Sequence, residues 1–266
     1  MSTAAGPPSA LRPAELFSCR GQVAVVTGAT SGIGRASAEA LAAAGARVLV
    51  AGLADGDPQA VARSLRAKGL DVIGMACDVT STDAPRQLVD AALERWERVD
   101  TVVCVAGAAL DDPEDPGSID AFDRMHDLHV RSVLRLAEAA LPVMARTGGG
   151  AFLVISSIAG LRGNRILSGY GVTKAANAQI ARNIAVQWGQ AGVRANAISP
   201  GVIDTEFARP ITADPAVAAT RRDRTPLRRF GRVEEVAGAV VWLASPAGAF
   251  VTGQNIVIDG GTLIAD

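Results

Sequence analysis

Seven short runs of apolar, largely β-branched residues recur along the chain. They predict strands over residues 22–28, 46–52, 71–77, 99–107, 150–157, 193–199 and 254–260. Alanine-rich stretches of helical length lie between them, at residues 34–46, 58–69, 84–96, 120–146, 169–190 and 232–245. Because the strands are apolar almost throughout, they fit a parallel sheet that helices cover on both faces. The pattern predicts a single-domain, doubly wound α/β fold.

Composition and charge narrow the class of protein. Of the 266 residues, 49% are hydrophobic and 20% are charged, which is typical of a soluble globular protein. A formal net charge of −1 gives no electrostatic reason to expect a nucleic acid or an anionic membrane as partner. Residues 1–17 are rich in Ala, Pro and Ser and predict a flexible lead-in to a domain that spans residues 18–266.

The ends and the cysteines bear on location. The first residues lack the basic start and apolar segment of a signal peptide, and no run approaches the roughly 20 apolar residues that cross a bilayer. Cys19, Cys77 and Cys104 are far apart in the sequence, which is typical of buried thiols in a reducing compartment. We therefore expect a cytoplasmic protein.

A glycine-rich turn follows the first predicted strand, in the segment "VAVVTGATSGIGRASAEAL". Gly28, Gly32 and Gly34 would permit a tight turn, close approach to a pyrophosphate and close packing of helix on strand. Free N–H groups at the start of the helix attract phosphate. Ordinary strand-to-helix turns also contain glycine, but the position after the first strand favours nucleotide binding.

The end of the second strand should distinguish NAD from NADP. An acid there normally binds the ribose of NAD, and a basic residue accepts the extra phosphate of NADP. Gly52 and Leu53 occupy these positions. Asp55 either reaches back to the ribose or is a solvated loop acid, and Arg35 either meets a 2′-phosphate or is an exposed helix residue. We expect NADP or NAD, with a preference for NADP because nothing obvious repels its phosphate.

Tyr170 is the only tyrosine in the chain and stands four residues before Lys174, one helical turn away on the same face. A free phenol titrates near pH 10, but a neighbouring ammonium stabilises the phenolate and lowers that pKa. The pair would then act as a proton donor and acceptor near neutral pH. Tyr-x-x-x-Lys also arises by chance. Ser157 ends a predicted strand and either hydrogen-bonds a substrate carbonyl or caps the strand end.

Six motifs occur in order between about Gly21 and Gly261: TGATSGIG, CDVT, ISS, YGVTK, SPGVIDT and VTGQNIVIDGG. Together they resemble the short-chain dehydrogenase/reductase family. The resemblance implies a seven-stranded Rossmann sheet and an NAD(P)-dependent oxidoreductase that interconverts a ketone or aldehyde and an alcohol. It also implies a small-molecule substrate and a homotetramer or homodimer, with helices 121–146 and 169–190 packed across the interface.

The resemblance assigns roles to single residues. Tyr170 is the general acid/base, Lys174 tunes it and binds the nicotinamide ribose, and Ser157 orients the substrate oxygen. Asp78 and Val79 would contact the adenine, although Asp78 also fits an ordinary turn acid. The full set of cofactor-binding candidates besides Tyr170 and Lys174 is Gly28, Ser31, Gly32, Ile33, Gly34, Arg35, Asp78, Val79, Ala106, Gly107, Pro200, Gly201, Val202 and Thr205.

Two positions depart from the family pattern. The family usually has Asn-Asn-Ala-Gly where this chain has Cys104 to Gly107, and we expect small apolar side chains to fill the space of the two amides. His129 stands in place of a catalytic asparagine that supports a water-linked proton path from the lysine. An imidazole either relays protons, with a pKa near 6.5, or preserves one hydrogen bond inside the helix. His129 is therefore a catalytic candidate.

Several alternatives stay open. The fold also suits a catalytically weak dinucleotide-binding regulator or scaffold, and a lyase, dehydratase or epimerase that reuses the site. The sequence does not identify the substrate, and Arg162 or Arg165 either pairs with an acidic substrate or lies on the surface. His126 and His129 lack a third ligand at suitable spacing, so we expect no metal. Candidate pocket residues are 108–110, Ile158, 162–167 and the segment 206–226, which resembles the family's substrate lid.

Overall fold

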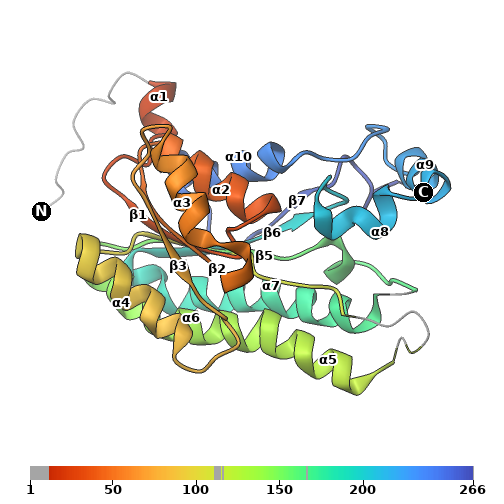
Figure 1. Cartoon of the computed structure of the whole chain (residues 1–266), viewed down its shortest axis with the longest axis horizontal. Helices are drawn as coiled ribbons and strands as arrows, with labels where there is room; N and C mark the ends of the chain where they lie inside the picture. The colour runs from red at the N-terminus through yellow and green to blue at the C-terminus, as the bar shows by residue number, and fades with distance from the viewer. Residues whose placement is uncertain (1–11, 111–114, 116, 166, 266) are drawn as a thin grey trace, which may run out of the picture.

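A seven-stranded parallel sheet forms the centre of the protein (Figure 1). The computed structural model describes residues 12–110, 115, 117–165 and 167–265. The strands are β1 Val23–Thr27, β2 Arg47–Gly52, β3 Val72–Ala76, β4 Thr101–Cys104, β5 Gly150–Ile155, β6 Val193–Pro200 and β7 Asn255–Ile258. Their order is β3-β2-β1-β4-β5-β6-β7, and every neighbouring pair is parallel. The predicted doubly wound, seven-stranded Rossmann sheet is confirmed.

Helices cover both faces of the sheet. The helices of the described chain are α1 Pro13–Leu16, α2 Gly32–Ala43, α3 Pro58–Arg66, α4 Ala84–Trp96, α5 Ile119–His126, α6 Ser132–Arg146, α7 Ser168–Trp188, α8 Arg209–Thr212, α9 Pro215–Asp223 and α10 Val233–Ala244. Figure 1 shows α2, α3 and α10 on one side of the sheet and α4, α6 and α7 on the other. The sheet is therefore the middle of three layers.

The two core layers explain the unbroken apolar strands. In β1, Val23 and Val25 pack into the layer of α4, α6 and α7, whereas Ala24 and Val26 pack into the layer of α2, α3 and α10. All four side chains are fully buried. Because successive side chains of a strand point to opposite faces, a strand with two covered faces needs apolar residues at every position.

Three local features go beyond the sequence prediction. The helix predicted over 120–146 contains a π-helical turn at Asp127–Arg131, between α5 and α6. One helical turn, α1, lies in the predicted lead-in, whose residues 1–11 fall outside the described part of the chain. The segment 206–226 folds into α8 and α9. Asp214 caps α9 by accepting hydrogen bonds from two backbone N–H groups, and Pro215 begins it, an arrangement that favours a helix start.

Candidate functional site

A cavity of about 640 Å³ opens at the carboxyl ends of the strands. Both β2 and β4 pair with β1, so the winding of the chain reverses beside β1. In open α/β sheets this reversal leaves a crevice at the carboxyl edge, where ligands bind. The volume lies in the range of ligand-binding clefts.

Most of the residues that the sequence singled out line this one cavity. They are Gly28, Ser31, Gly32, Ile33, Gly34, Asp78, Val79, Ala106, Gly107, Ser157, Tyr170, Lys174, Pro200, Gly201, Val202 and Thr205. Two candidates do not: Arg35 is exposed outside the lining, and His129 is buried behind it. Of the candidate pocket residues, Ala108, Ile158, Arg162, Asn164 and Leu167 line the cavity, whereas Ile166 lies outside the described residues.

The glycine turn has the shape that a dinucleotide requires. Gly28 and Gly32 have φ angles of +63° and +51°, in the region that favours glycine. A Cβ on Gly28 would come within 2.7 Å of the Ala106 backbone, and one on Gly34 would overlap the carbonyl oxygen of Gly28. The helix α2 begins at Gly32 and directs its first N–H groups at the cavity edge. These residues therefore fit a nicotinamide dinucleotide, and the start of α2 would hold its pyrophosphate.

The far wall of the cavity carries acidic side chains. Asp55 and Asp78 line it together with Gly52 and Leu53. One carboxylate oxygen of Asp78 accepts hydrogen bonds from the backbone N–H and the hydroxyl of Thr80, at 2.9 and 2.7 Å. Arg35 is not part of this wall, so the described residues place no arginine or lysine there.

Ser157, Tyr170 and Lys174 meet at the opposite end of the cavity. The Lys174 ammonium donates a hydrogen bond to the carbonyl oxygen of Ile155 at 2.9 Å and lies 5.5 Å from the centre of the Tyr170 ring. Burial lowers the pKa of Lys174 to about 8. Ser157 lies two residues after β5, and its hydroxyl oxygen accepts a hydrogen bond from the backbone N–H of Ala159 at 3.1 Å. The hydroxyl hydrogen of Ser157 can still be donated to a ligand.

His129 joins two walls of this site from behind. Its Nε2 accepts a hydrogen bond from the backbone N–H of Ala108 at 3.1 Å, and its Nδ1 lies 2.8 Å from the hydroxyl oxygen of Thr173. The Thr173 hydroxyl donates to the carbonyl oxygen of Tyr170 at 2.8 Å, so it must accept from Nδ1–H. The His129 ring also meets the Tyr170 ring edge-on, with centroids 5.5 Å apart.

These contacts favour positioning over proton relay for His129. Both ring nitrogens are engaged, and a second ring proton would meet the N–H of Ala108 head-on. Burial, followed by the charge of Lys174, lowers the pKa of His129 to about 3. A neutral imidazole therefore fastens the loop after β4 to α7. Thr173, which the sequence reasoning did not single out, is the third member of this chain of hydrogen bonds, and its place inside YGVTK was the only signal.

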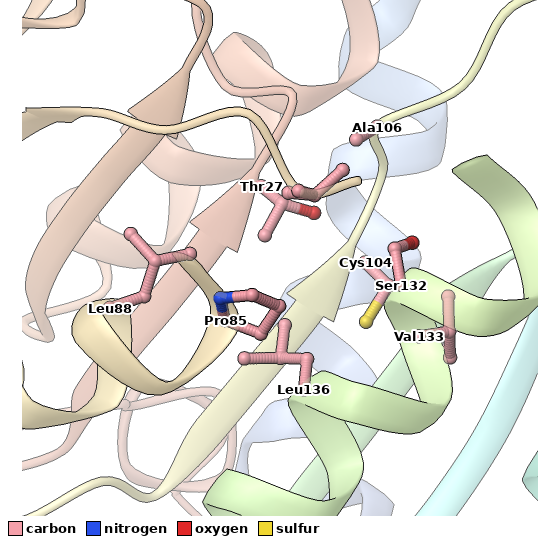
Figure 2. A pocket seen from close by; sticks show the side chains of 9 residues that line it. Thr27, Pro85, Leu88, Cys104, Ala106, Ser132, Val133 and Leu136 are labelled. Atoms are coloured by element: carbon pink, nitrogen blue, oxygen red, sulfur yellow. The ribbon is translucent and has the colours of Figure 1, made fainter. Parts of the chain in front are cut away.

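Cys104 shows how the missing amides are replaced. Burial raises the pKa of its thiol to about 12, so it stays protonated and packs as a small apolar group. Figure 2 shows Cys104 beside Thr27, Pro85, Ser132 and Leu136, around a void of about 10 Å³. A void of that size lies at the lower limit for one water molecule. Cys104 thus fills the space of one amide and leaves a small residual gap, whereas Val105, at the second amide position, is half-buried and lines the ligand cavity.

The substrate end of the cavity includes side chains from the segment 206–226. Phe207 lies with its ring 6.1 Å from that of Tyr170, and Ile211 and Arg221 complete this wall. Leu167 also packs beside Tyr170, and Arg162 lines the same cavity. Sequence reasoning named the segment but not these side chains, because their position depends on how α8 and α9 fold over the sheet edge.

Other site types find little support in the part of the chain that the structure describes. No group of three His, Cys, Asp or Glu side chains lies close enough to hold a metal ion. No helix of that part is long and apolar enough to span a bilayer. All three cysteines are buried free thiols.

Comparison with known proteins agrees with this geometry. A family model described as enoyl-(acyl carrier protein) reductase matches residues 28–262. The chain belongs to the short-chain dehydrogenase/reductase family. The dehydrogenases and reductases among its relatives support an oxidoreductase.

Three relatives illustrate the range of ligands in similar proteins. A cis-4-hydroxycyclohexanecarboxylate dehydrogenase from Sinomonas cyclohexanicum is 39% identical over 243 residues, 90% of this chain and 96% of that protein. A gluconate 5-dehydrogenase from Burkholderia cenocepacia J2315, in complex with NADP and tartrate, has a TM-score of 0.91 at 29% identity, with coverage of 96% and 100%. A 7α-hydroxysteroid dehydrogenase complexed with NADH and 7-oxo glycochenodeoxycholic acid has a TM-score of 0.90 at 31% identity, with coverage of 94% and 98%. The bound NADP and NADH support a nicotinamide dinucleotide as cofactor.

We predict that His129 makes the protein acid-sensitive. Below the ordinary histidine pKa of 6.5, the unfolded chain takes up a proton at His129 that the folded chain refuses until about pH 3. The free energy of unfolding therefore falls as the pH falls through this window. Urea titrations at pH 7 and pH 5 measure this loss. Between the two pH values, the free energy of unfolding of His129→Asn should fall by about 2 kcal/mol less than that of the wild type.

The control is His126→Asn, one turn earlier, whose ring packs beside Phe122. It should keep the pH dependence of the wild type. Equal acid sensitivity in the wild type and His129→Asn would contradict a neutral His129 imidazole that links Ala108 to Thr173.

Proposed function

We propose that the protein is an NAD(P)-dependent oxidoreductase that interconverts a ketone or aldehyde and an alcohol. One observation carries the proposal: Ser157, Tyr170 and Lys174 lie in the same cavity as a glycine turn shaped for a pyrophosphate. The relatives named above, whose printed names are those of dehydrogenases, support this reaction type.

The residues of the chain divide the work around the substrate oxygen. Tyr170 donates a proton to that oxygen during reduction and removes it during oxidation. The nearby ammonium of Lys174 stabilises the phenolate and would hold the nicotinamide ribose. Ser157 donates its hydroxyl hydrogen to the substrate oxygen. The Phe207 ring lies beside the Tyr170 ring and lines the site. The bound nicotinamide supplies or accepts the hydride.

The first test separates binding from chemistry. Tyr170→Phe keeps the ring that packs against His129 and Phe207 but removes the proton carrier. We expect dinucleotide affinity within about twofold of wild type, and turnover of a carbonyl panel at least about 100-fold lower. Nicotinamide fluorescence measures the first and NAD(P)H absorbance the second. If the wild type binds the dinucleotide but converts no carbonyl or alcohol, the dinucleotide-binding regulator becomes the better account.

The acidic wall also revises the expected cofactor preference. The sequence-based preference for NADP rested on the lack of a repelling charge, yet Asp55 lines the cavity beside Leu53 and Arg35 does not. We therefore propose that the protein prefers NAD. NADH should bind more tightly than NADPH. Asp55→Asn should lower the ratio of the NADPH dissociation constant to the NADH dissociation constant about two- to fivefold, as expected for one exposed charge. Asp90→Asn, on the outer surface of α4, is the matched control, and tighter binding of NADPH by the wild type would refute the preference.

We also propose that the protein forms a homodimer or homotetramer through α6 and α7. Leu134 on α6 and Val172 and Val186 on α7 expose 49%, 58% and 85% of their surface. Such apolar groups on the two long helices favour an interface there.

Buried free thiols also fit the expected reducing, cytoplasmic environment.

Light scattering should give two or four times the mass of one chain, and Val186→Lys should shift the protein toward monomer. Phe250→Lys, which changes a fully exposed apolar residue outside these helices, should leave the mass unchanged. A monomeric wild type would rule out this assembly.

A further inference from the structure

Two arginines give the substrate end of the cavity a positive charge that the described residues leave unbalanced. Arg221 is half-buried on α9, and Arg162 is exposed on the loop that follows β5. Both line the cavity that contains Ser157 and Tyr170. Among the described residues, neither guanidinium has an ion pair or a side-chain hydrogen bond.

The acids near Arg221 are engaged elsewhere. Glu206, which also lines the cavity, pairs with Arg209 at 2.7 Å. Asp223 pairs with Arg228 at 3.6 Å, and Asp214 accepts hydrogen bonds from backbone N–H groups at the start of α9. None of the described acids therefore supplies a counter-ion to Arg221.

The neighbouring arginine behaves differently. Arg222 points its guanidinium at the Phe230 ring, 5.6 Å from the ring centre, and does not line the cavity. The two adjacent arginines of α9 are thus separated by function: one covers an aromatic ring, and the other faces the cavity.

Large apolar side chains also line the cavity. Leu167 and Phe207 pack beside Tyr170, and Ile158 and Ile211 line the same cavity. A ligand that satisfies the wall needs an apolar body and an anionic group placed at its edge. A guanidinium is well suited to a carboxylate, because its planar fork can donate two parallel hydrogen bonds.

We propose that the substrate is a hydroxy or keto carboxylic acid with an apolar skeleton, and that Arg221, assisted by Arg162, binds its carboxylate. This inference rests on the proposed oxidoreductase function and names the substrate class of the same site. Tyr170 and Ser157 hold the reacting oxygen at one end of the substrate, and the arginines hold the carboxylate at the other.

The test compares one acid with its neutral ester. The probes are 4-oxocyclohexanecarboxylate and its methyl ester, which share the ring and the ketone but differ in charge and in one methyl group. We expect the wild type to show a KM at least about tenfold lower for the acid, in the range of a charge-assisted hydrogen bond. Arg221→Gln should raise the KM for the acid by a similar factor while kcat changes less than about threefold. The KM for the ester should barely move.

Matched variants separate charge from shape. Arg221→Lys should recover part of the preference for the acid, because it restores the charge without the fork. Arg162→Gln should have a smaller effect than Arg221→Gln, since Arg162 is more exposed. Arg222→Gln, next in sequence and outside the cavity, should leave the acid-to-ester ratio at the wild-type value.

Each other outcome has a definite meaning. Equal loss for acid and ester in Arg221→Gln would show a structural role for α9 and overturn the inference. Weaker NADH binding in that variant would assign the guanidinium to the cofactor phosphates, with the same consequence. Turnover of the ester without preference for the acid would refute this inference and leave the oxidoreductase intact. Calorimetric titration of both probes measures the preference for the acid even if the enzyme converts neither of them. Lack of turnover with tighter binding of the acid would count against the oxidoreductase function but not against the carboxylate site.

Discussion

One buried positive charge organises the site. The Lys174 ammonium lies in the interior with the carbonyl oxygen of Ile155 as its hydrogen-bond acceptor, and a buried charge without such a partner would be costly. That requirement ties α7 to the end of β5. The Ser156 hydroxyl adds a second tie by donating to the carbonyl oxygen of Lys174 at 2.6 Å. Gly160 adds a third, since a Cβ there would lie 2.6 Å from the backbone nitrogen of Ala175. The distance between Tyr170 and the sheet edge is therefore set by backbone contacts as well as by side chains.

The sequence predicts most of the framework because the framework depends on local patterns. Each of the seven strands was placed within a few residues, since a strand buried on both faces leaves an unbroken apolar run. The glycine turn and the Tyr170–Lys174 pair were readable for the same reason, because both are short and contiguous. The wall beside Tyr170 was not readable. Phe207 reaches it from a distant segment whose path is set by packing over the sheet edge.

The two departures from the family pattern needed the structure for their interpretation. From the sequence, His129 was open to two roles, because a histidine changes its chemistry with its surroundings. The N–H of Ala108 and the hydroxyl of Thr173 decide between them, and neither contact is visible in a linear pattern. The role of Cys104 was easier to predict, because a small side chain in a buried strand can do little besides pack. In place of the two amides, the loop after β4 is held by the imidazole at Ala108 and by the Thr27 hydroxyl oxygen, which accepts a hydrogen bond from the N–H of Val105 at 3.2 Å.

The π-helical turn at Asp127–Arg131 gives one continuous helix two orientations. A π turn fits one more residue into its ladder than an α turn does, and each residue of an α-helix advances the side-chain direction by about 100°. Before the turn, Met125 packs with Tyr170 and Ala159, whereas after it Leu136 and Met144 pack against the sheet. Loss of one residue here would rotate the active-site half of the helix against the core half. The π-helical turn thus changes the side-chain direction along the helix, so that α5 faces the active site and α6 faces the sheet.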